Sequence, residues 1–321
     1  MSPRITRRGI QIALGLIWLL DGALQFQSYM YSREFIPETI EPMLSMQPAW
    51  LAHSIHWAGH LAGSNLTVWN TLFALVQCAI GLGLLYRPTV RPALALSFGW
   101  ALVVWWFGEG FGMLFMNMGS PFNGAPGAVL FYAVVGLLVW PTGSEDTRSA
   151  AASGPLGERG GLAVWSAVWG CSVLLWLEVL MRPIYSISGS LIEASGDSMP
   201  WLSSLQRSLS TALEGDGKAT AAILLAVSFA LAAGVWTSWR RQTLVLGILV
   251  SLVYWMLGQS LGGLTTGSAT DPNIAPLFVL LAFAVWPTAL ASEGARSPSS
   301  RSPRLAAETI VDPRSRPLRC G

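Results

Sequence analysis

The chain has 321 residues, of which 52% are hydrophobic and only 11% are charged, and its mean hydropathy is +0.50. A soluble domain carries about 25% charged residues, so this composition excludes an ordinary water-soluble protein and favours the lipid bilayer as its solvent. The formal net charge is only +2. Such a balance gives no reason to expect a nucleic acid partner.

Eight predominantly apolar segments follow one another along the chain. A transmembrane helix needs about 20 such residues, and the segments cover residues 9–27, 66–86, 93–107, 127–140, 161–181, 220–239, 244–257 and 275–286. They predict an all-α membrane protein with eight transmembrane helices. Asp21 interrupts the first segment and no clear cleavage site follows it, so we interpret this segment as a retained span rather than a signal peptide.

A Gly-rich stretch after the third span is repeated 150 residues later. GEGFGMLFMNMGSPFNGAP at 108–126 corresponds to GQSLGGLTTGSATDPNIAP at 258–276. The shared positions are Gly108 and Gly258, Gly112 and Gly262, Asn123 and Asn273, and the Ala-Pro pairs at 125–126 and 275–276. SMQPAWL at 45–51 likewise recurs as SMPWL at 198–202. Self-similarity at one long offset indicates an internal duplication, and four spans in each unit make the two repeats parallel.

The duplication predicts the domain organisation. Residues 1–141 form the first four-helix unit and residues 161–289 form the second. Residues 142–160, which are rich in Gly, Ser and Ala, read as a cytoplasmic linker. Residues 290–321 are rich in Arg, Ser and Pro, so we expect a disordered tail.

The arginines predict the orientation in the membrane. With the N-terminus inside, the segments on the cytoplasmic side hold fifteen arginines and the outer segments hold four basic residues. This asymmetry fits the positive-inside rule. It places both termini in the cytoplasm and both Gly-rich loops on the outer face of a plasma (inner) membrane.

All three histidines lie between the first two spans. His53, His56 and His60 are spaced i, i+3, i+7 and share one face of a helix. Imidazole binds metals and carries protons, which favours a metal or quinone site. The other interpretation is an amphipathic helix at the membrane interface, anchored by Trp50 and Trp57. Positions i and i+7 are about 10 Å apart along the axis, so the three histidines need further ligands to bind one ion.

Methionines are concentrated on the predicted outer side. Those that bear on a soft-metal site are Met43, Met46, Met113, Met116 and Met118. Thioethers are soft ligands that favour Cu(I), whereas methionine also fills gaps in protein cores. The second Gly-rich loop has glycine, threonine and serine where the first has its methionines, namely Gly263, Thr266 and Ser268. A copper site and simple packing therefore both stay open.

Three carboxylates lie in or beside the apolar segments, and Glu178, near the outer end of the fifth span, is the shallow one that can reach the interface. Asp21 is twelve residues into the first span, about 18 Å deep at 1.5 Å per residue, and Glu109 follows the third span. A charge at the bilayer centre costs at least about 2.5–3.5 kcal/mol, so such side chains face protein or water and are candidates for function. Desolvation favours the protonated carboxyl group, which makes Asp21 and Glu109 the expected proton acceptors. A structural hydrogen bond is the alternative role.

The Gly-rich loops are candidate rims of an outward-facing pocket. Glycines permit left-handed backbone and close helix approach. Asn123 and Asn273 can bond to their own backbone, and Gln259 replaces Glu109 in the second copy. No GK[ST] sequence follows either loop, which excludes a phosphate-binding loop of that type. Irregular backbone at membrane depth must be buried in protein or line a cavity.

A four-span unit whose outer loop is Gly-rich and ends in Asn-x-Ala-Pro resembles the DoxX/DoxD family of membrane proteins. LGQSLGGLTTGSATDPNIAPL at 257–277 carries the likeness most clearly, and GEGFGMLFMNMGSPFNGAPG at 108–127 less closely. Members are four-helix subunits associated with quinone-linked redox systems, including thiosulfate:quinone oxidoreductase. The chain departs from a simple member because its unit is doubled and because a His-bearing stretch separates its first two spans.

The resemblance implies a subunit of a quinone-linked redox or oxidant-defence assembly, with a quinone and a membrane or extracytoplasmic redox partner protein. The residues expected at its pocket are Asp21, Glu109, His53, His56, His60, Asn123, Asn273 and Gln259. Two alternatives come from other classes: a copper-handling protein that uses the Met and His residues, and a membrane scaffold with no site. The first requires methionines close to the histidines, and the second requires no cavity under the Gly-rich loops.

Overall fold

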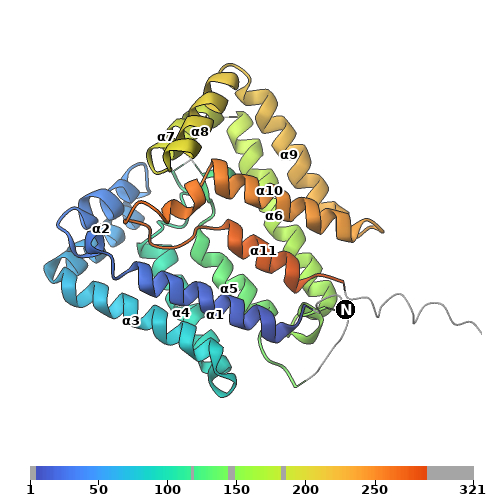
Figure 1. Cartoon of the computed structure of the whole chain (residues 1–321), viewed down its shortest axis with the longest axis horizontal. Helices are drawn as coiled ribbons and strands as arrows, with labels where there is room; N and C mark the ends of the chain where they lie inside the picture. The colour runs from blue at the N-terminus through green and yellow to red at the C-terminus, as the bar shows by residue number, and fades with distance from the viewer. Residues whose placement is uncertain (1–4, 117–118, 144–148, 182–185, 288–321) are drawn as a thin grey trace, which may run out of the picture.

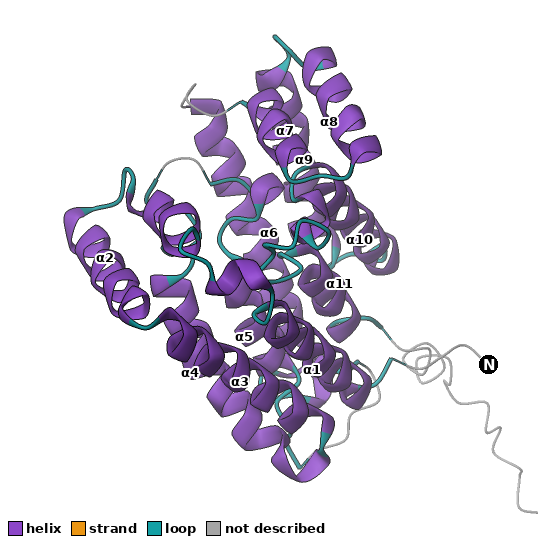
Figure 2. Cartoon of the chain, turned by 60° about the vertical axis from the view of Figure 1, so that its left-hand side comes forward, coloured by secondary structure: helices purple, strands orange, loops and turns teal. Residues whose placement is uncertain are grey.

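The computed structural model describes residues 5–116, 119–143, 149–181 and 186–287, and every regular element within these ranges is helical. Figure 2 accordingly shows helices joined by loops. The proposed tail at 290–321 and Met118 lie outside the described residues.

A helix lies in each of the eight apolar segments. These helices are α1 (Arg7–Leu24), α3 (Leu66–Leu85), α4 (Val90–Phe107), α5 (Ala128–Leu138), α6 (Gly157–Met181), α9 (Gly217–Gly234), α10 (Arg240–Leu257) and α11 (Ala275–Ala284). Three further helices lie in the polar stretches after α1 and α6: α2 (Ala49–Ser64), α7 (Ile187–Gly196) and α8 (Pro200–Ala212). The SMQPAWL and SMPWL segments begin α2 and α8, with Trp50 and Trp201 each the second helical residue.

Four helical segments are long and apolar enough to cross a membrane: Leu66–Leu85, Arg87–Phe107, Gly157–Met181 and Gly217–Gly234. They mark the chain as a lipid-embedded protein. Helices α5 and α11 are apolar but have only 11 and 10 residues. At 1.5 Å per residue each is about 15 Å long, which is half the thickness of the hydrocarbon core.

The short helices α5 and α11 occupy the centre of the bundle. They pack against each other, α5 also packs against α4, and α11 against α10. The outer pairs are α1 with α3 and α6 with α9 (Figure 1). Aromatic rings pack against one another at this centre. The ring centroid of Phe278 in α11 lies 4.7 Å from that of Phe131 in α5 and 5.4 Å from that of Trp169 in α6.

Arginines cluster at one end of the bundle and bond to carbonyls there. Arg8 donates to the Leu84 carbonyl oxygen at 2.8 Å, and Arg91 donates to that of Pro141 at 3.1 Å. Arg240 lies 2.6 Å from the Glu158 carboxylate. The last carbonyls of a helix have no partner within the helix, and Arg8 satisfies one of them, in the last turn of α3.

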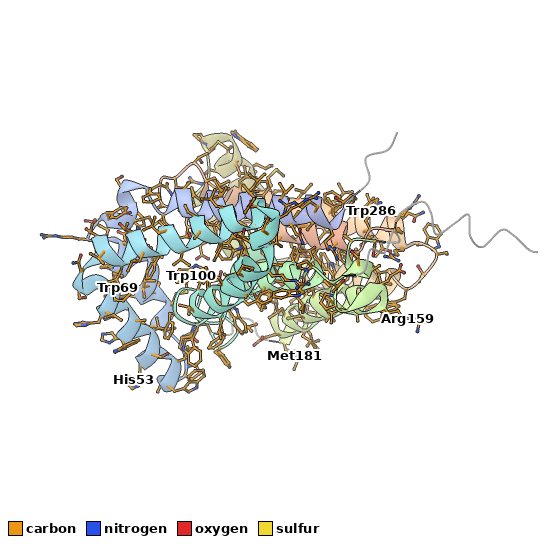
Figure 3. All side chains as sticks on the ribbon, turned by 90° about the horizontal axis from the view of Figure 1, so that it is seen from below. His53, Trp69, Trp100, Arg159, Met181 and Trp286 are labelled. Atoms are coloured by element: carbon orange, nitrogen blue, oxygen red, sulfur yellow. The ribbon has the colours of Figure 1, made fainter. Side chains whose placement is uncertain are left out.

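The other end of the bundle carries the additional helices. In Figure 1 the start of α1 and the α3–α4 and α9–α10 connections lie along the lower and right margins, whereas α2, α7 and α8 lie toward the upper left. Figure 3 shows His53 and Trp69 at one end of the molecule and Arg159 and Trp286 at the other.

The backbone of the two Gly-rich segments follows the same path. Four successive residues in each have left-handed φ values between +50° and +74°: Gly110, Phe111, Gly112 and Met113 in the first, and Ser260, Leu261, Gly262 and Gly263 in the second. A β-carbon on Gly112 would lie 1.9 Å from the Pro126 carbonyl oxygen. Glycine is therefore required there both by its φ and by the close approach of the chain.

The second halves of the two segments do not align at the offset of 150 residues that the sequence predicted. Trp105 and Trp255 each donate from the indole N–H to a proline carbonyl at 2.7 Å, but the acceptors are Pro126 and Pro272, which lie 21 and 17 residues further on. The alignment of Asn123 with Asn273 is thus not a structural equivalence. The path from tryptophan to its proline acceptor is four residues shorter in the second segment. Asn273 lies two residues before α11, whereas Asn123 belongs to a separate turn.

Part of the stretch expected to be a linker is packed structure. Ala150, Ala151 and Ser153 are buried, and Arg7 of α1 donates to the Ser153 carbonyl oxygen at 2.6 Å. Helix α6 begins at Gly157, before the predicted boundary at 161. The small residues that suggested flexibility also allow this stretch to fit closely against its neighbours; a β-carbon on Gly161, for example, would lie 2.8 Å from that of Ala151.

Candidate functional site

Asp21 and Glu109 line the same cavity, which has a volume of about 190 Å³. Helices α1 to α5 contribute to its walls, together with a one-turn π-helix at Ile36–Ile40 and the end of the second Gly-rich segment. Six of the lining side chains are aromatic: Trp18, Phe35, Phe73, Trp100, Phe107 and Tyr132. The site therefore draws on both halves of the chain.

Asp21 projects from the inward face of α1. The residue is 2% exposed, and its Oδ1 atom has no hydrogen-bond partner among the described residues. The Tyr132 side chain of α5 interacts with this carboxylate, and the Tyr132 ring lies 4.4 Å from that of Trp18, one helical turn before Asp21. One carboxylate oxygen is thus buried and available to a ligand.

Glu109 lies just after the end of α4, and its side chain accepts a hydrogen bond from the first turn of α5. Its Oε1 atom accepts a hydrogen bond from the Val129 backbone N–H at 3.0 Å, while its buried Oε2 atom has no partner in the described chain. Burial raises the pKa of Glu109 to about 8, and the negative charge of Asp271 adds to this effect. A β-carbon on Gly127 would lie 2.2 Å from Oε2, so glycine makes room for the carboxyl group.

Asp271 is a third carboxylate at the cavity and comes from the second Gly-rich segment. Its oxygens accept hydrogen bonds from the Asn273 backbone N–H at 2.7 Å and from the Thr270 hydroxyl at 2.8 Å. Desolvation nevertheless raises the pKa of Asp271. Asp271 is not among the site residues expected from the sequence. It is the one acidic residue within 258–276, and that isolation is the signal that could have found it.

The cavity contains acids but no base. Among the described residues that line it, none is arginine, lysine or histidine. The other polar side chains are neutral: Gln25, Thr39, Gln77, Tyr132 and Thr270. The carboxylates must therefore be neutralised by protons or by a ligand, because a buried charge without a partner is costly.

The histidines lie on the opposite face of α2 from its buried residues. His53, His56 and His60 are all exposed, and Figure 3 shows His53 at the margin of the molecule. His56 and His60 border a second, outer pocket of about 520 Å³, together with residues that include Arg33. Within the described parts of the chain, no three His, Cys, Asp or Glu side chains are placed to hold a metal ion.

One wall separates the outer pocket from the carboxylate cavity. Ile36, Ile40 and Gly59 line both spaces. A β-carbon on Gly59 would lie 3.2 Å from the Cγ2 atom of Ile40. The π-helix and α2 therefore meet closely here, and π-helical turns often mark functional positions.

The methionines do not gather at either space. Met116 is buried and Met113 is half-buried with a left-handed backbone. Of the described residues that line the cavity and the outer pocket, none is methionine.

The predicted amide side chains lie between or within the two Gly-rich segments and do not line the cavity. Gln259 donates from Nε2 to the Pro121 carbonyl oxygen at 3.4 Å. Asn123 forms a reciprocal capping arrangement with Ser120. Asn273 lies against Gly124, where a β-carbon would be 2.6 Å from its Oδ1 atom. The two segments thus meet directly, and each contributes a carboxylate to the cavity.

Comparison of the chain with protein-family models, with curated proteins and with solved structures finds no match. The site must therefore be interpreted from its own geometry.

Proposed function

We propose that this chain is a DoxX-like membrane subunit of a quinone-linked redox or oxidant-defence assembly, and that the carboxylate cavity binds the quinone ring. The observation that supports this function best is the convergence of Asp21 and Glu109 on one aromatic cavity. Both residues were singled out from the sequence as proton acceptors. The electrons would pass to or from a redox partner protein.

Quinone chemistry requires protons at the ring oxygens. Reduction of a quinone to a quinol consumes two electrons and two protons, and oxidation returns them. Carboxyl groups in an apolar site can supply or accept these protons because burial moves the carboxyl pKa toward neutrality. Glu109, whose pKa is about 8, suits this role at physiological pH. Asp21 offers a second buried carboxyl group with one unpartnered oxygen.

The walls of the cavity suit a planar ring. An apolar cavity of about 150 Å³ admits benzene in another protein, and the volume here is about 190 Å³. Trp18, Tyr132 and Trp100 provide aromatic faces and edges. Gln25 and Gln77 add neutral hydrogen-bonding groups that can contact ring oxygens.

The proposed topology has eight spans in two parallel repeats, with both termini in the cytoplasm of a plasma-membrane protein. The shared left-handed segments, the paired Trp105 and Trp255 bonds, and the arginines at one end of the bundle support it. The short helices α5 and α11 would complete their crossings through the buried Gly-rich segments, since irregular backbone is tolerated where protein surrounds it.

Single cysteines in a cysteine-free background test this topology. We expect a membrane-impermeant maleimide to label Ser64→Cys and Glu214→Cys in intact cells. Gly143→Cys should react only after the membrane is permeabilised. Labelling of all three positions in intact cells would contradict the orientation.

The two alternatives have weaker support. A copper-handling protein requires methionines near the histidines, and neither space described above is lined by methionine. A scaffold without a site requires no polar convergence under the Gly-rich segments, whereas three carboxylates border one cavity there.

Quinone binding to purified protein tests the proposed function. We expect a ubiquinone or menaquinone analogue with a short tail to bind wild-type protein. Glu109→Gln and Asp21→Asn should weaken binding or abolish its pH dependence, whereas Glu178→Gln on α6 should not. Absence of binding to wild-type protein, with metal analysis showing copper near one per chain, would replace this function with copper handling.

A further inference from the structure

The charge balance of the cavity is unusual for a buried site. Asp21, Glu109 and Asp271 face it, and no basic side chain of the described chain does. Burial raises the pKa of Glu109, and the negative charge of Asp271 adds to this effect. When any of these groups ionises, no described side chain lining the cavity supplies a compensating positive charge.

The acidic cluster is accompanied by unpartnered atoms that point to a ligand. Asp21 is 2% exposed and lines the cavity, and its Oδ1 atom makes no hydrogen bond to any described residue. The Oε2 atom of Glu109 is in the same situation. Native proteins rarely leave buried acceptors unsatisfied, so each atom marks a position where a ligand can bind.

The side chains that line the cavity favour an organic cation over a metal ion. The described carboxylates do not converge in a way that would hold a metal ion. Most of the cavity wall is apolar, and aromatic rings line it from α1, α3, α4 and α5. Aromatic faces attract organic cations through their quadrupoles, and an apolar wall favours a cation that carries its own hydrophobic groups.

We propose that this cavity binds a monovalent organic cation with apolar substituents, such as a quaternary phosphonium or ammonium ion, in exchange for a proton. The inference uses the cavity of the proposed function but does not depend on a quinone.

The exchange keeps the charge of the site constant. The O–H bond of a carboxyl group breaks, the proton passes to solvent, and the resulting carboxylate pairs with the cation, so one positive charge leaves as another arrives. Glu109 is the exchanging group because its pKa of about 8 allows it to hold or release the proton near neutral pH. The other titratable groups facing it are Asp21, Tyr132 and Asp271, while α2, α3 and the π-helix add none.

Titration calorimetry with phenyltrimethylammonium, which carries a single aromatic ring and suits a cavity of about 190 Å³, tests the proposal on the full-length protein in detergent. We expect binding to strengthen as the pH rises from 6 to 8, by up to about tenfold per pH unit when one proton is displaced. A dye in weakly buffered solution should report release of about one proton per bound cation. The neutral compound tert-butylbenzene, which has the same shape, should bind more weakly and without pH dependence.

Matched variants locate the site. Glu109→Gln should abolish proton release and reduce phenyltrimethylammonium affinity at least tenfold, while Glu109→Asp should restore part of both. Glu178→Gln, a half-buried carboxyl group on α6 outside the cavity, should behave as wild type. Asp271→Asn keeps a side-chain acceptor for the Asn273 N–H and should weaken binding less than Glu109→Gln does. Thermal unfolding in the same detergent establishes that each variant is folded.

Three results would overturn the proposal: no binding of phenyltrimethylammonium to folded wild-type protein, binding with no release of protons, or equal binding of the neutral compound. Quinone binding is measured separately on the same preparation. Cation binding without quinone binding would therefore remove the proposed function alone, and the reverse would remove this inference alone.

Discussion

The Oε1 atom of Glu109 accepts a 3.0 Å hydrogen bond from the Val129 backbone N–H, so a carboxyl group at the end of α4 caps the first turn of α5. Free N–H groups at a helix start favour a negative charge. Burial of Glu109 and the negative charge of Asp271 disfavour the ionised carboxylate. These two effects outweigh the backbone hydrogen bonds, so that the pKa of Glu109 is raised to about 8. The residue is therefore poised between a structural capping role and proton exchange.

This raised pKa predicts how stability depends on pH. The folded protein binds the Glu109 proton more tightly than the unfolded chain, where the pKa is near 4.5. The stability that the neutral carboxyl group contributes is fully present below pH 4.5 and is lost as the pH rises through about 8. Relative to Glu109→Gln, we expect the unfolding free energy of wild-type protein to fall by up to about 1.4 kcal/mol per pH unit within this window.

Thermal unfolding in detergent from pH 5 to 9 measures this difference. Glu193→Gln, at an exposed position on α7, serves as the control and should follow wild type. Parallel curves for wild type and Glu109→Gln would show that Glu109 does not titrate in this range.

Two glycines with positive φ, one outside and one inside a left-handed segment, predict different losses of stability on substitution by alanine. Gly215→Ala introduces only backbone strain, because φ is +92° and no atom lies within 4 Å of the added carbon. We expect it to cost about 1–2 kcal/mol. Gly112→Ala adds a clash with the Pro126 carbonyl and should cost about 4 kcal/mol or more. Denaturation of purified variants measures both values, and equal losses would contradict the close approach.

The paired indole bonds predict similar effects in the two halves of the chain. Trp105→Phe and Trp255→Phe each remove an N–H donor 2.7 Å from a proline carbonyl. Each substitution should lower the unfolding free energy by about 1–3 kcal/mol, because the carbonyl loses its partner. Trp201→Phe, whose side chain is 56% exposed, should cost under about 0.5 kcal/mol. A loss of unfolding free energy in only one of the two variants would show that the two indole bonds do not stabilise the fold equally.

The shared wall predicts how reagents reach Glu109. Gly59→Leu would fill the contact between α2 and Ile40, 3.2 Å from the added β-carbon. We expect it to slow modification of Glu109 by a water-soluble carbodiimide several-fold. Gly63→Leu lies on the same helix but borders only the outer pocket, so it should change the rate little. Mass spectrometry of peptides containing Glu109 follows the reaction. An unchanged rate in Gly59→Leu would show that access does not pass this wall.

The sequence alone determined where eight of the helices lie and singled out two of the three carboxylates that line the cavity. Runs of consecutive apolar residues specify helices because hydropathy is a local property, and the structure has a helix in each expected segment. Asp21 and Glu109 stood out because a carboxylate is costly within such a run. The offset of 150 residues also pointed to the two Gly-rich segments, which share a left-handed backbone.

Tertiary structure alone decided what these residues form together. Asp21 and Asp271 face one cavity although 250 positions separate them, and hydropathy carries no information about such a contact. The half-length of α5 and α11, the exposed histidines and the shifted register after Trp255 also depend on how distant segments pack. A cavity is a property of surfaces that meet in space, and consecutive residues do not encode it.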